Sequence, residues 1–237
     1  MQEITIESLK KNSGLPGPRA NLGLLDTFIR DCDQENVQDC LSELKEDTEN
    51  SPEEFVGMCG VVGYSMLNWR DDELLVGHLR KYAIHRSWRV REAVAIAIQE
   101  IPFDTLEERT DLTRRLESID PLVNRAIVAG LCEPRNLKKQ VGSRAVIDHL
   151  QRATALLDKT GKLTTGEESL KKALGYCWSV ALVEDFEYGS KVFESLFEIK
   201  NKSTKWIIQE NLKKNRLQKK YKNWVEERVR QLTKFST

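Results

Sequence analysis

Apolar residues recur every three or four positions along most of this chain, which is the spacing of one face of an α-helix. The pattern is clearest in "WRVREAVAIAIQEI", residues 88–101. Its apolar positions form a single stripe: Val90, Ala93, Val94, Ala97, Ile98 and Ile101. The small side chains of Ala93 and Ala97 let a neighbouring helix approach closely. We therefore predict that this segment is an inner, well-packed helix of a stack.

Several predicted helices begin with similar residues. Three segments have the spacing of a capping box: Ser51 with Glu54, Thr105 with Glu108, and Thr165 with Glu168. In a capping box the hydroxyl accepts a hydrogen bond from the third helical amide, and the glutamate accepts one from the amide of the cap. Asp71, Ser87 and Asp120 are further predicted N-caps, and Asp120 is followed by a proline at the first helical position.

These signals predict about thirteen helices joined by short connections, and no segment has the alternating pattern of a strand. The predicted helices span residues 3–11, 18–32, 34–46, 52–67, 72–84, 88–101, 105–117, 121–132, 144–158, 166–184, 186–199, 204–217 and 219–235. The predicted fold class is therefore all-α.

The helical pattern also repeats. "WRVREAVAIAI" aligns with "PLVNRAIVAGL", which places Arg91 on Arg125, 34 residues later. A looser copy, "STKWIIQENL", places Lys205 there after a further 80 residues, about two periods of ~40. Stacked helix pairs of this length bury a core that one pair cannot form alone. We predict a single domain over 1–237, a right-handed superhelical solenoid of antiparallel helix pairs, with capping helices over 1–50 and 204–237.

The segments "WRVREAVA" and "DPLVNRAIVA" resemble HEAT repeats, over roughly residues 70–220. The segments "WRVREAV" and "KWIIQENLKKNRL" are also similar to the HEAT-like superfamily that includes bacterial DNA alkylation-repair glycosylases. The first resemblance implies a curved surface that binds a partner. The second implies a basic concave face that holds DNA. The catalytic carboxylate and aromatic residues of those glycosylases do not map onto this chain, so the catalytic residues are unknown.

Charge is spread unevenly along the chain. Residues 200–237 contain nine Lys and three Arg against three Glu, a net charge of +9, while the whole chain is neutral. Apolar positions in this part form an amphipathic stripe: Leu217, Tyr221, Trp224, Val225, Leu232 and Phe235. Cations lie beside that stripe: Lys213, Lys214, Arg216, Lys219, Lys220 and Lys222. They predict contact with an acidic partner, either a phosphate backbone or an acidic protein surface. The alternative is a solvated face of the last helices.

Three tryptophans lie next to a cation in the sequence: Trp69 before Arg70, Trp88 before Arg89, and Trp206 after Lys205. Such pairs can stack bases and hold phosphates, and the alternative is a packing role at helix ends. Arg91 and Arg125 have the alternative of bridging adjacent repeats. The candidate partner-binding residues are Trp69, Arg70, Trp88, Arg89, Arg91, Arg125, Lys205, Trp206, Lys213, Lys214, Arg216, Lys219 and Lys220.

Other chemistry is sparse. The five cysteines are widely spaced without a CxxC motif, which predicts reduced, mostly buried thiols in a cytoplasmic protein. The three histidines lack metal-binding spacing, and no phosphate or dinucleotide loop is present. We expect no cofactor, no metal and no membrane segment, and we expect a monomer.

Two functions follow from these observations. The first is a non-enzymatic helical-repeat interaction module that binds a protein or nucleic acid on its concave or basic C-terminal surface. The second is a DNA-binding alkylation-repair protein, which as an enzyme would be a DNA glycosylase acting on alkylated bases. The neutral net charge and the absence of a recognisable catalytic set favour the first.

Overall fold

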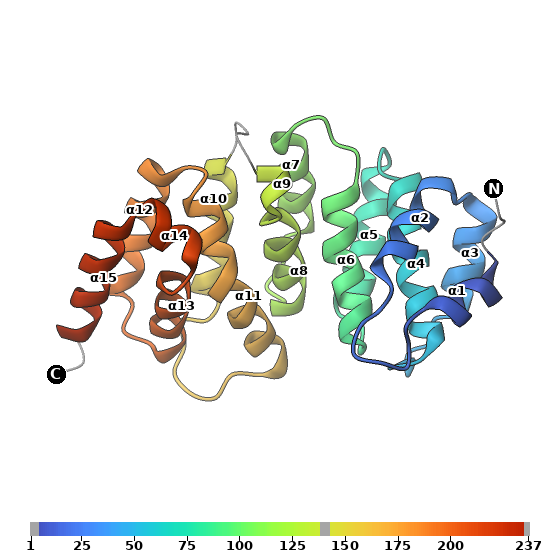
Figure 1. Cartoon of the computed structure of the whole chain (residues 1–237), viewed down its shortest axis with the longest axis horizontal. Coiled ribbons are helices and arrows are strands. Elements are labelled where there is room, and N and C mark those ends of the chain that lie inside the picture. Colours follow the sequence, from blue (N-terminus) through green and yellow to red (C-terminus); the bar gives the residue numbers. More distant parts are fainter. Residues whose placement is uncertain (1–4, 138–142, 235–237) are drawn as a thin grey trace. The chain divides into compact units, whose positions relative to one another are not determined.

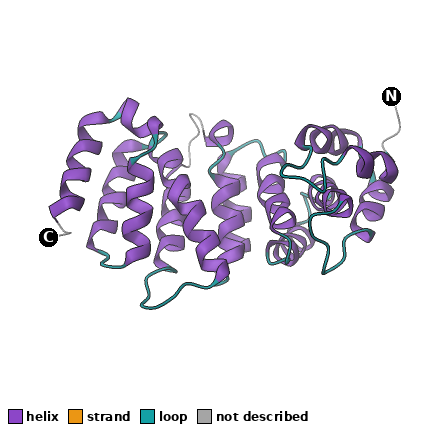
Figure 2. Cartoon of the chain, turned by 60° about the horizontal axis from the view of Figure 1, so that its bottom comes forward, coloured by secondary structure: helices purple, strands orange, loops and turns teal. Residues whose placement is uncertain are grey.

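The computed structural model describes residues 5–137 and 143–234, and within them the chain is helical with no strand (Figure 2). The all-α prediction is thus confirmed. The chain divides into two compact units, one ending at Phe103 and the other beginning at Asp104. A single superhelical solenoid stays a prediction.

The first unit is built around one central helix (Figure 1). Its helices are α1 (Ile6–Asn12), α2 (Leu22–Asp31), α3 (Gln34–Ser42), α4 (Pro52–Leu67), α5 (Asp72–Ala83) and α6 (Trp88–Glu100). Helix α4 packs against the other five, which explains why it is apolar on every side. A Cβ on Gly60 would lie 2.9 Å from the backbone nitrogen of Leu41, so glycine lets α3 lie directly against α4.

Helix α6 lies beside α4, and the two N-termini meet. All six residues of the apolar stripe, five in α6 and its C-cap Ile101, are buried, so the prediction of an inner, well-packed helix is confirmed. At the shared N-terminal end, Glu54 of α4 is fully buried and accepts hydrogen bonds from Ser87 Oγ and from Arg89 Nη1, the latter at 3.1 Å. Ser87, the N-cap of α6, also accepts from the amides of Arg89 and Val90.

The second unit contains the remaining helices. These are α7 (Leu106–Leu116), α8 (Pro121–Leu131), α9 (Pro134–Leu137), α10 (Ser143–Ala155), α11 (Thr165–Leu182), α12 (Phe186–Ser195), the 3-10 helix η1 (Leu196–Glu198), α13 (Lys202–Leu212), α14 (Asn215–Lys220) and α15 (Lys222–Lys234). Helices α8, α11 and α13 form one layer, and α7, α10 and α12 form a second layer packed against it.

Side-chain hydrogen bonds link the helices within each layer of the second unit. Asn211 of α13 donates to the carbonyl of Leu174 at 2.9 Å and accepts from the amide of Ser179 at 2.8 Å, both on α11. In the other layer, Tyr188 of α12 donates to Asp148 of α10 at 2.5 Å. Trp178 is fully buried, and its Nε1 donates to Thr154 across the two layers at 3.1 Å. The layers are therefore fixed by specific polar contacts as well as by apolar packing.

The capping predictions had mixed outcomes. Thr105 and Glu108 form the predicted box, and Asp71, Ser87 and Asp120 are N-caps as predicted. The predicted box of Thr165 and Glu168 is wrong by one residue. Thr164 and Glu167 form it instead, because Glu167 also pairs with Lys159 at 2.6 Å in that register. The predicted box at Ser51 is wrong as well, since Ser51 makes no side-chain cap and Glu54 turns inward to Ser87 and Arg89.

Several predicted boundaries were also wrong. The segment 186–199 is α12 followed by η1, and 204–217 is divided between α13 and α14. The predicted helix 219–235 is interrupted at Tyr221, whose ring stacks on Phe186 with 3.5 Å between centroids and so turns the chain. The short helix α9 was missed. Phe235 of the predicted stripe lies outside the described residues.

Candidate partner-binding surface

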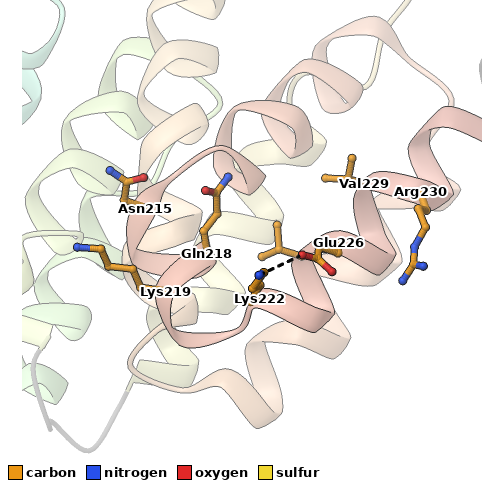
Figure 3. A pocket seen from close by; sticks show the side chains of 8 residues that line it. Asn215, Gln218, Lys219, Lys222, Glu226, Val229 and Arg230 are labelled. Carbon is orange, nitrogen blue, oxygen red and sulfur yellow. Dashed lines mark ion pairs between the residues drawn. The ribbon is translucent and has the colours of Figure 1, made fainter.

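The basic C-terminal helices α14 and α15 border a groove of about 620 Å³ (Figure 3). It is lined by Asn215, Gln218 and Lys219 from α14 and by Lys222, Val225, Glu226, Val229 and Arg230 from α15. Val225 is buried, whereas the side chain of Val229 is 45% exposed on an otherwise polar face. Three cations surround these valines against one carboxylate, Glu226, which lies 3.9 Å from Lys222. The groove therefore combines an apolar floor with a positive rim.

Aromatic contacts hold α15 against α12. Phe186 of α12 stacks on Tyr221 and meets Trp224 edge-to-face at 5.2 Å. The indole Nε1 of Trp224 donates to Glu194 at 2.7 Å, and Arg228 lies 3.4 Å from the same carboxylate. Burial raises the pKa of the Tyr221 hydroxyl above its ordinary value, so this ring stays neutral. The groove is thus formed by anchored helices.

The other basic residues of this region have different surroundings. Lys220 donates to the carbonyl of Val183 at 3.2 Å, beyond the C-terminus of α11, where a cation is favoured by the helix dipole. Lys213 pairs with Glu210 at 2.6 Å on the exposed surface. Lys205 is half-buried and lines a separate pocket with Lys200 and Lys202. Of the predicted cations beside the stripe, Lys219 and Lys222 line the α14–α15 groove.

A second cluster lies on α11, α13 and α14. Tyr176 is 41% exposed, and the guanidinium of Arg216 lies over its ring at 4.5 Å while donating to its hydroxyl at 2.6 Å. Lys214 approaches the same ring at 5.9 Å. Trp206 lies across Gly175, where a Cβ would be 2.7 Å from the indole, and Lys171 lies 5.3 Å from that ring. We call these residues the Tyr176 cluster.

In the first unit, the structure separates the two tryptophan–arginine pairs. Trp69 follows the C-terminus of α4, where Arg70 covers its ring at 4.1 Å and Phe103 meets it edge-to-face at 5.7 Å. Trp88 begins α6 and is 50% exposed. Because Phe103 lies beyond the C-terminus of α6, the 13 residues of that helix hold the pairs roughly 20 Å apart.

The predicted arginines have structural contacts. Arg89 is buried, bonded to Glu54 and, through Nη2, to the carbonyl of Gly17 at 2.7 Å, so only its stacking on Trp88 at 4.6 Å approaches the surface. Arg91 donates to the carbonyls of His85 and Arg86 after α5. Arg125 is half-buried on α8. These contacts favour packing roles for Arg89 and Arg91.

Sequence reasoning missed part of the groove. In the Tyr176 cluster it named Lys214, Arg216 and Trp206 but missed Tyr176 and Lys171. Val229 and Arg230 fell outside the predicted stripe, although the spacing of Val229 four residues after Val225 was a usable signal. Tyr176 is 40 residues from Arg216 in the chain, and no local pattern joins them. Buried Glu54 was assigned to a cap because its spacing from Ser51 fitted one.

Two histidines and most of the cysteines lie away from solvent. Desolvation lowers the pKa of His78 and of His149 to about 4, so both are neutral at pH 7. His78 donates from Nε2 to the carbonyl of Val61 at 3.0 Å, and His149 Nδ1 lies 3.6 Å from Glu117. All five thiols are free, and four are buried. Across residues 5–137 and 143–234 no group of three His, Cys, Asp or Glu residues is arranged to hold a metal ion.

Comparisons of the chain with protein-family models, with curated proteins and with solved structures find no match. The resemblances to HEAT repeats and to alkylation-repair glycosylases thus stay predictions. Within the described part of the chain, no helix has the length and apolar character that crossing a bilayer requires.

Proposed function

We propose that this protein is a non-enzymatic helical-repeat interaction module that binds an acidic amphipathic helix of a protein partner in the α14–α15 groove. The observation that carries the proposal is the exposed Val229, one helical turn from the buried Val225, in a groove that is also lined by Lys219, Lys222 and Arg230. A groove between two helices with an apolar floor accepts the apolar face of a third helix. Carboxylates beside that face would meet the cations of the rim.

The partner's chemistry follows from the floor and the rim together. A phosphate backbone would use the cations and leave the exposed Val229 without an apolar complement. An acidic helix with leucines spaced by three or four residues would cover Val229 and neutralise the rim at the same time. Arg230 and Lys219 have no ion pair among the described residues, so both are available for carboxylates. This combination supports a protein partner over DNA.

The Tyr176 cluster supports a second candidate, the DNA-binding alkylation-repair function. An exposed aromatic ring with Arg216 and Lys214 over it has the composition of a base-stacking site on a nucleic-acid surface. On this alternative, DNA would contact the Tyr176 cluster and depend little on Val229.

The test is a fluorescence-anisotropy titration with two probes, a Glu-rich amphipathic helical peptide and a duplex DNA of the same net charge. We expect Lys219→Gln/Lys222→Gln and, separately, Val229→Ser to weaken peptide binding about tenfold. The matched control Lys172→Gln/Lys191→Gln removes the same charge from exposed positions on α11 and α12 and should bind like the parent.

Each outcome decides between the candidates. Peptide binding that is unchanged in Val229→Ser, or weakened as much by the control pair, would contradict the groove proposal. Tight duplex binding that is lost in Tyr176→Ala and retained in Val229→Ser would favour the second candidate. In that case, neutralising two lysines that contact phosphates should reduce the slope of log K for DNA binding against the logarithm of the salt concentration by about two units.

A further inference from the structure

A second pocket, of about 410 Å³, lies beside the N-terminus of α13, and the α14–α15 groove does not share its lining. It is lined by Phe197, Glu198, Ile199, Lys200, Asn201, Lys202, Lys205, Ile208 and Leu232. These residues come from η1, the loop that follows it, α13 and one residue of α15. The pocket has the size of a small-molecule site, for which about 300–1,000 Å³ is usual.

The interior of this pocket is apolar. Phe197, Ile199, Ile208 and Leu232 supply it, and Ile208 is buried while the other three are partly exposed to the hollow. An apolar hollow of this kind gains free energy when an apolar chain replaces water in it. A small inorganic anion cannot make that contact, so the interior selects a ligand with a hydrocarbon part.

The rim of the pocket is positive. Its lining contains three lysines, Lys200, Lys202 and Lys205, and one carboxylate, Glu198. Lys200 and Lys202 are exposed and form no ion pair in the described part of the chain. The first turn of α13 contains no acidic residue, although a helix N-terminus ordinarily favours one. Lys200 and Lys202 flank that N-terminus with the same sign as the helix dipole, and an anion placed between them would offset this unfavourable charge.

We infer that this pocket binds a free single-chain fatty acid, with the hydrocarbon chain against Phe197, Ile199, Ile208 and Leu232 and the carboxylate among the lysines. Charge complementarity selects the anionic head group, and the apolar interior selects the chain. Binding is non-covalent and does not depend on the proposed protein partner, because the two sites have different residues.

The test is isothermal titration calorimetry of the full chain with octanoate, decanoate and dodecanoate, each below its critical micelle concentration. Each added methylene that enters the pocket should tighten binding about fourfold, since burying one CH₂ is worth ~0.8 kcal/mol. Decanol and decyltrimethylammonium have the same chain with a neutral or a cationic head, and both should bind at least tenfold more weakly than decanoate. Equal binding of decanoate and decanol would refute the role of the lysines.

Two variants locate the site. Lys200→Gln/Lys202→Gln should weaken decanoate binding about tenfold and leave decanol unchanged, whereas Lys219→Gln/Lys222→Gln removes the same charge from the other groove and should bind decanoate like the parent. Ile199→Trp fills the hollow without changing charge and should abolish the dependence on chain length. The inference is overturned if decanoate does not bind, if both lysine pairs matter equally, or if Ile199→Trp binds like the parent. Binding to phosphatidylglycerol vesicles distinguishes attraction to an anionic membrane surface from binding of a free fatty acid. Attraction to the surface would not change in Ile199→Trp.

Discussion

Replacing Arg89 with alanine should strongly destabilise the first unit. The guanidinium of Arg89 lies in a buried site where Nη1 donates to Glu54 at 3.1 Å and Nη2 donates to the carbonyl of Gly17 at 2.7 Å. Its side chain is 7% exposed, and that of Glu54 is fully buried. Arg89→Ala would leave the Glu54 carboxylate with hydrogen bonds only from Ser87 and from the amide of Asn50.

The size of the effect follows from that burial. Removing one partner of a buried ion pair typically costs ~3–5 kcal/mol, because the remaining charge is left uncompensated. The total stability of a domain is only about 5–15 kcal/mol. We therefore expect Arg89→Ala to remove a large fraction of the unfolding free energy of the first unit, through the charge left on Glu54 more than through the lost contacts of the arginine.

The assay is urea denaturation followed by circular dichroism, with hydrogen exchange of the α4 and α6 amides to locate the change. A loss of ~3–5 kcal/mol should lower the urea midpoint by about 1 M or more, given slopes of ~1–3 kcal/mol/M. The double replacement Glu54→Gln/Arg89→Met should recover most of the loss, since it removes both charges and keeps similar volume.

Arg86→Ala is the matched control. Arg86 is three residues away, 69% exposed, and 3.8 Å from Glu49, so its loss should change stability by less than ~0.5 kcal/mol. If Arg89→Ala unfolds at the same urea concentration as Arg86→Ala, or if the double replacement is as unstable as Arg89→Ala, the reasoning from the buried charge is wrong.

Three further predictions concern stability. Ile98→Asp buries a charge in the fully buried stripe of α6 and should cost several kcal/mol, and a melting temperature equal to that of the parent would contradict the helix phase. Gly60→Ala should destabilise by ~1–3 kcal/mol, because its Cβ would lie 2.9 Å from the backbone of Leu41. A Cβ on Gly77 would have no neighbour within 4 Å, so Gly77→Ala should stabilise α5 by ~0.5–1 kcal/mol. Equal effects of Gly60→Ala and Gly77→Ala in urea denaturation would refute the packing argument. Desolvation keeps His78 neutral in the fold with a pKa of about 4, whereas the unfolded chain binds the proton near pH 6.5, so stability should fall as the pH falls from 6.5 to 4. His78→Phe should reduce that slope in pH-dependent denaturation, and an unchanged slope would show that His78 takes up its proton equally in both states.

The sequence predicted the helices well where one face alone determines their position. The stripe of α6 and the box at Thr105 depend on neighbours within one or two turns, so periodicity and spacing were enough. It failed where a contact outside the local motif chose between alternatives. Lys159 selected Thr164 over Thr165 as the cap, and Phe186 turned the chain at Tyr221.

The candidate site was predicted less well for the same reason. Charge density alone located the basic helices, but it could not distinguish Lys219 on the groove from Lys220 on the end of α11. Both tryptophan–arginine neighbours were predicted as candidate partner-binding residues, and the structure holds Trp69 and Trp88 at opposite ends of α6. Adjacency in the chain does not establish which side chains share a face in the fold.

The buried cysteines allow the local opening rate of each unit to be measured separately. Burial raises the pKa of Cys40 to about 12 and that of Cys59 and Cys132 well above the ordinary value, and only a thiolate reacts with an alkylating reagent. Alkylation of these positions must therefore wait for the surrounding helices to separate. Mass spectrometry of alkylated Cys40 and Cys59 would give the rate of local opening in the first unit. Alkylation of Cys132 would give the corresponding rate in the second unit, without any engineered probe.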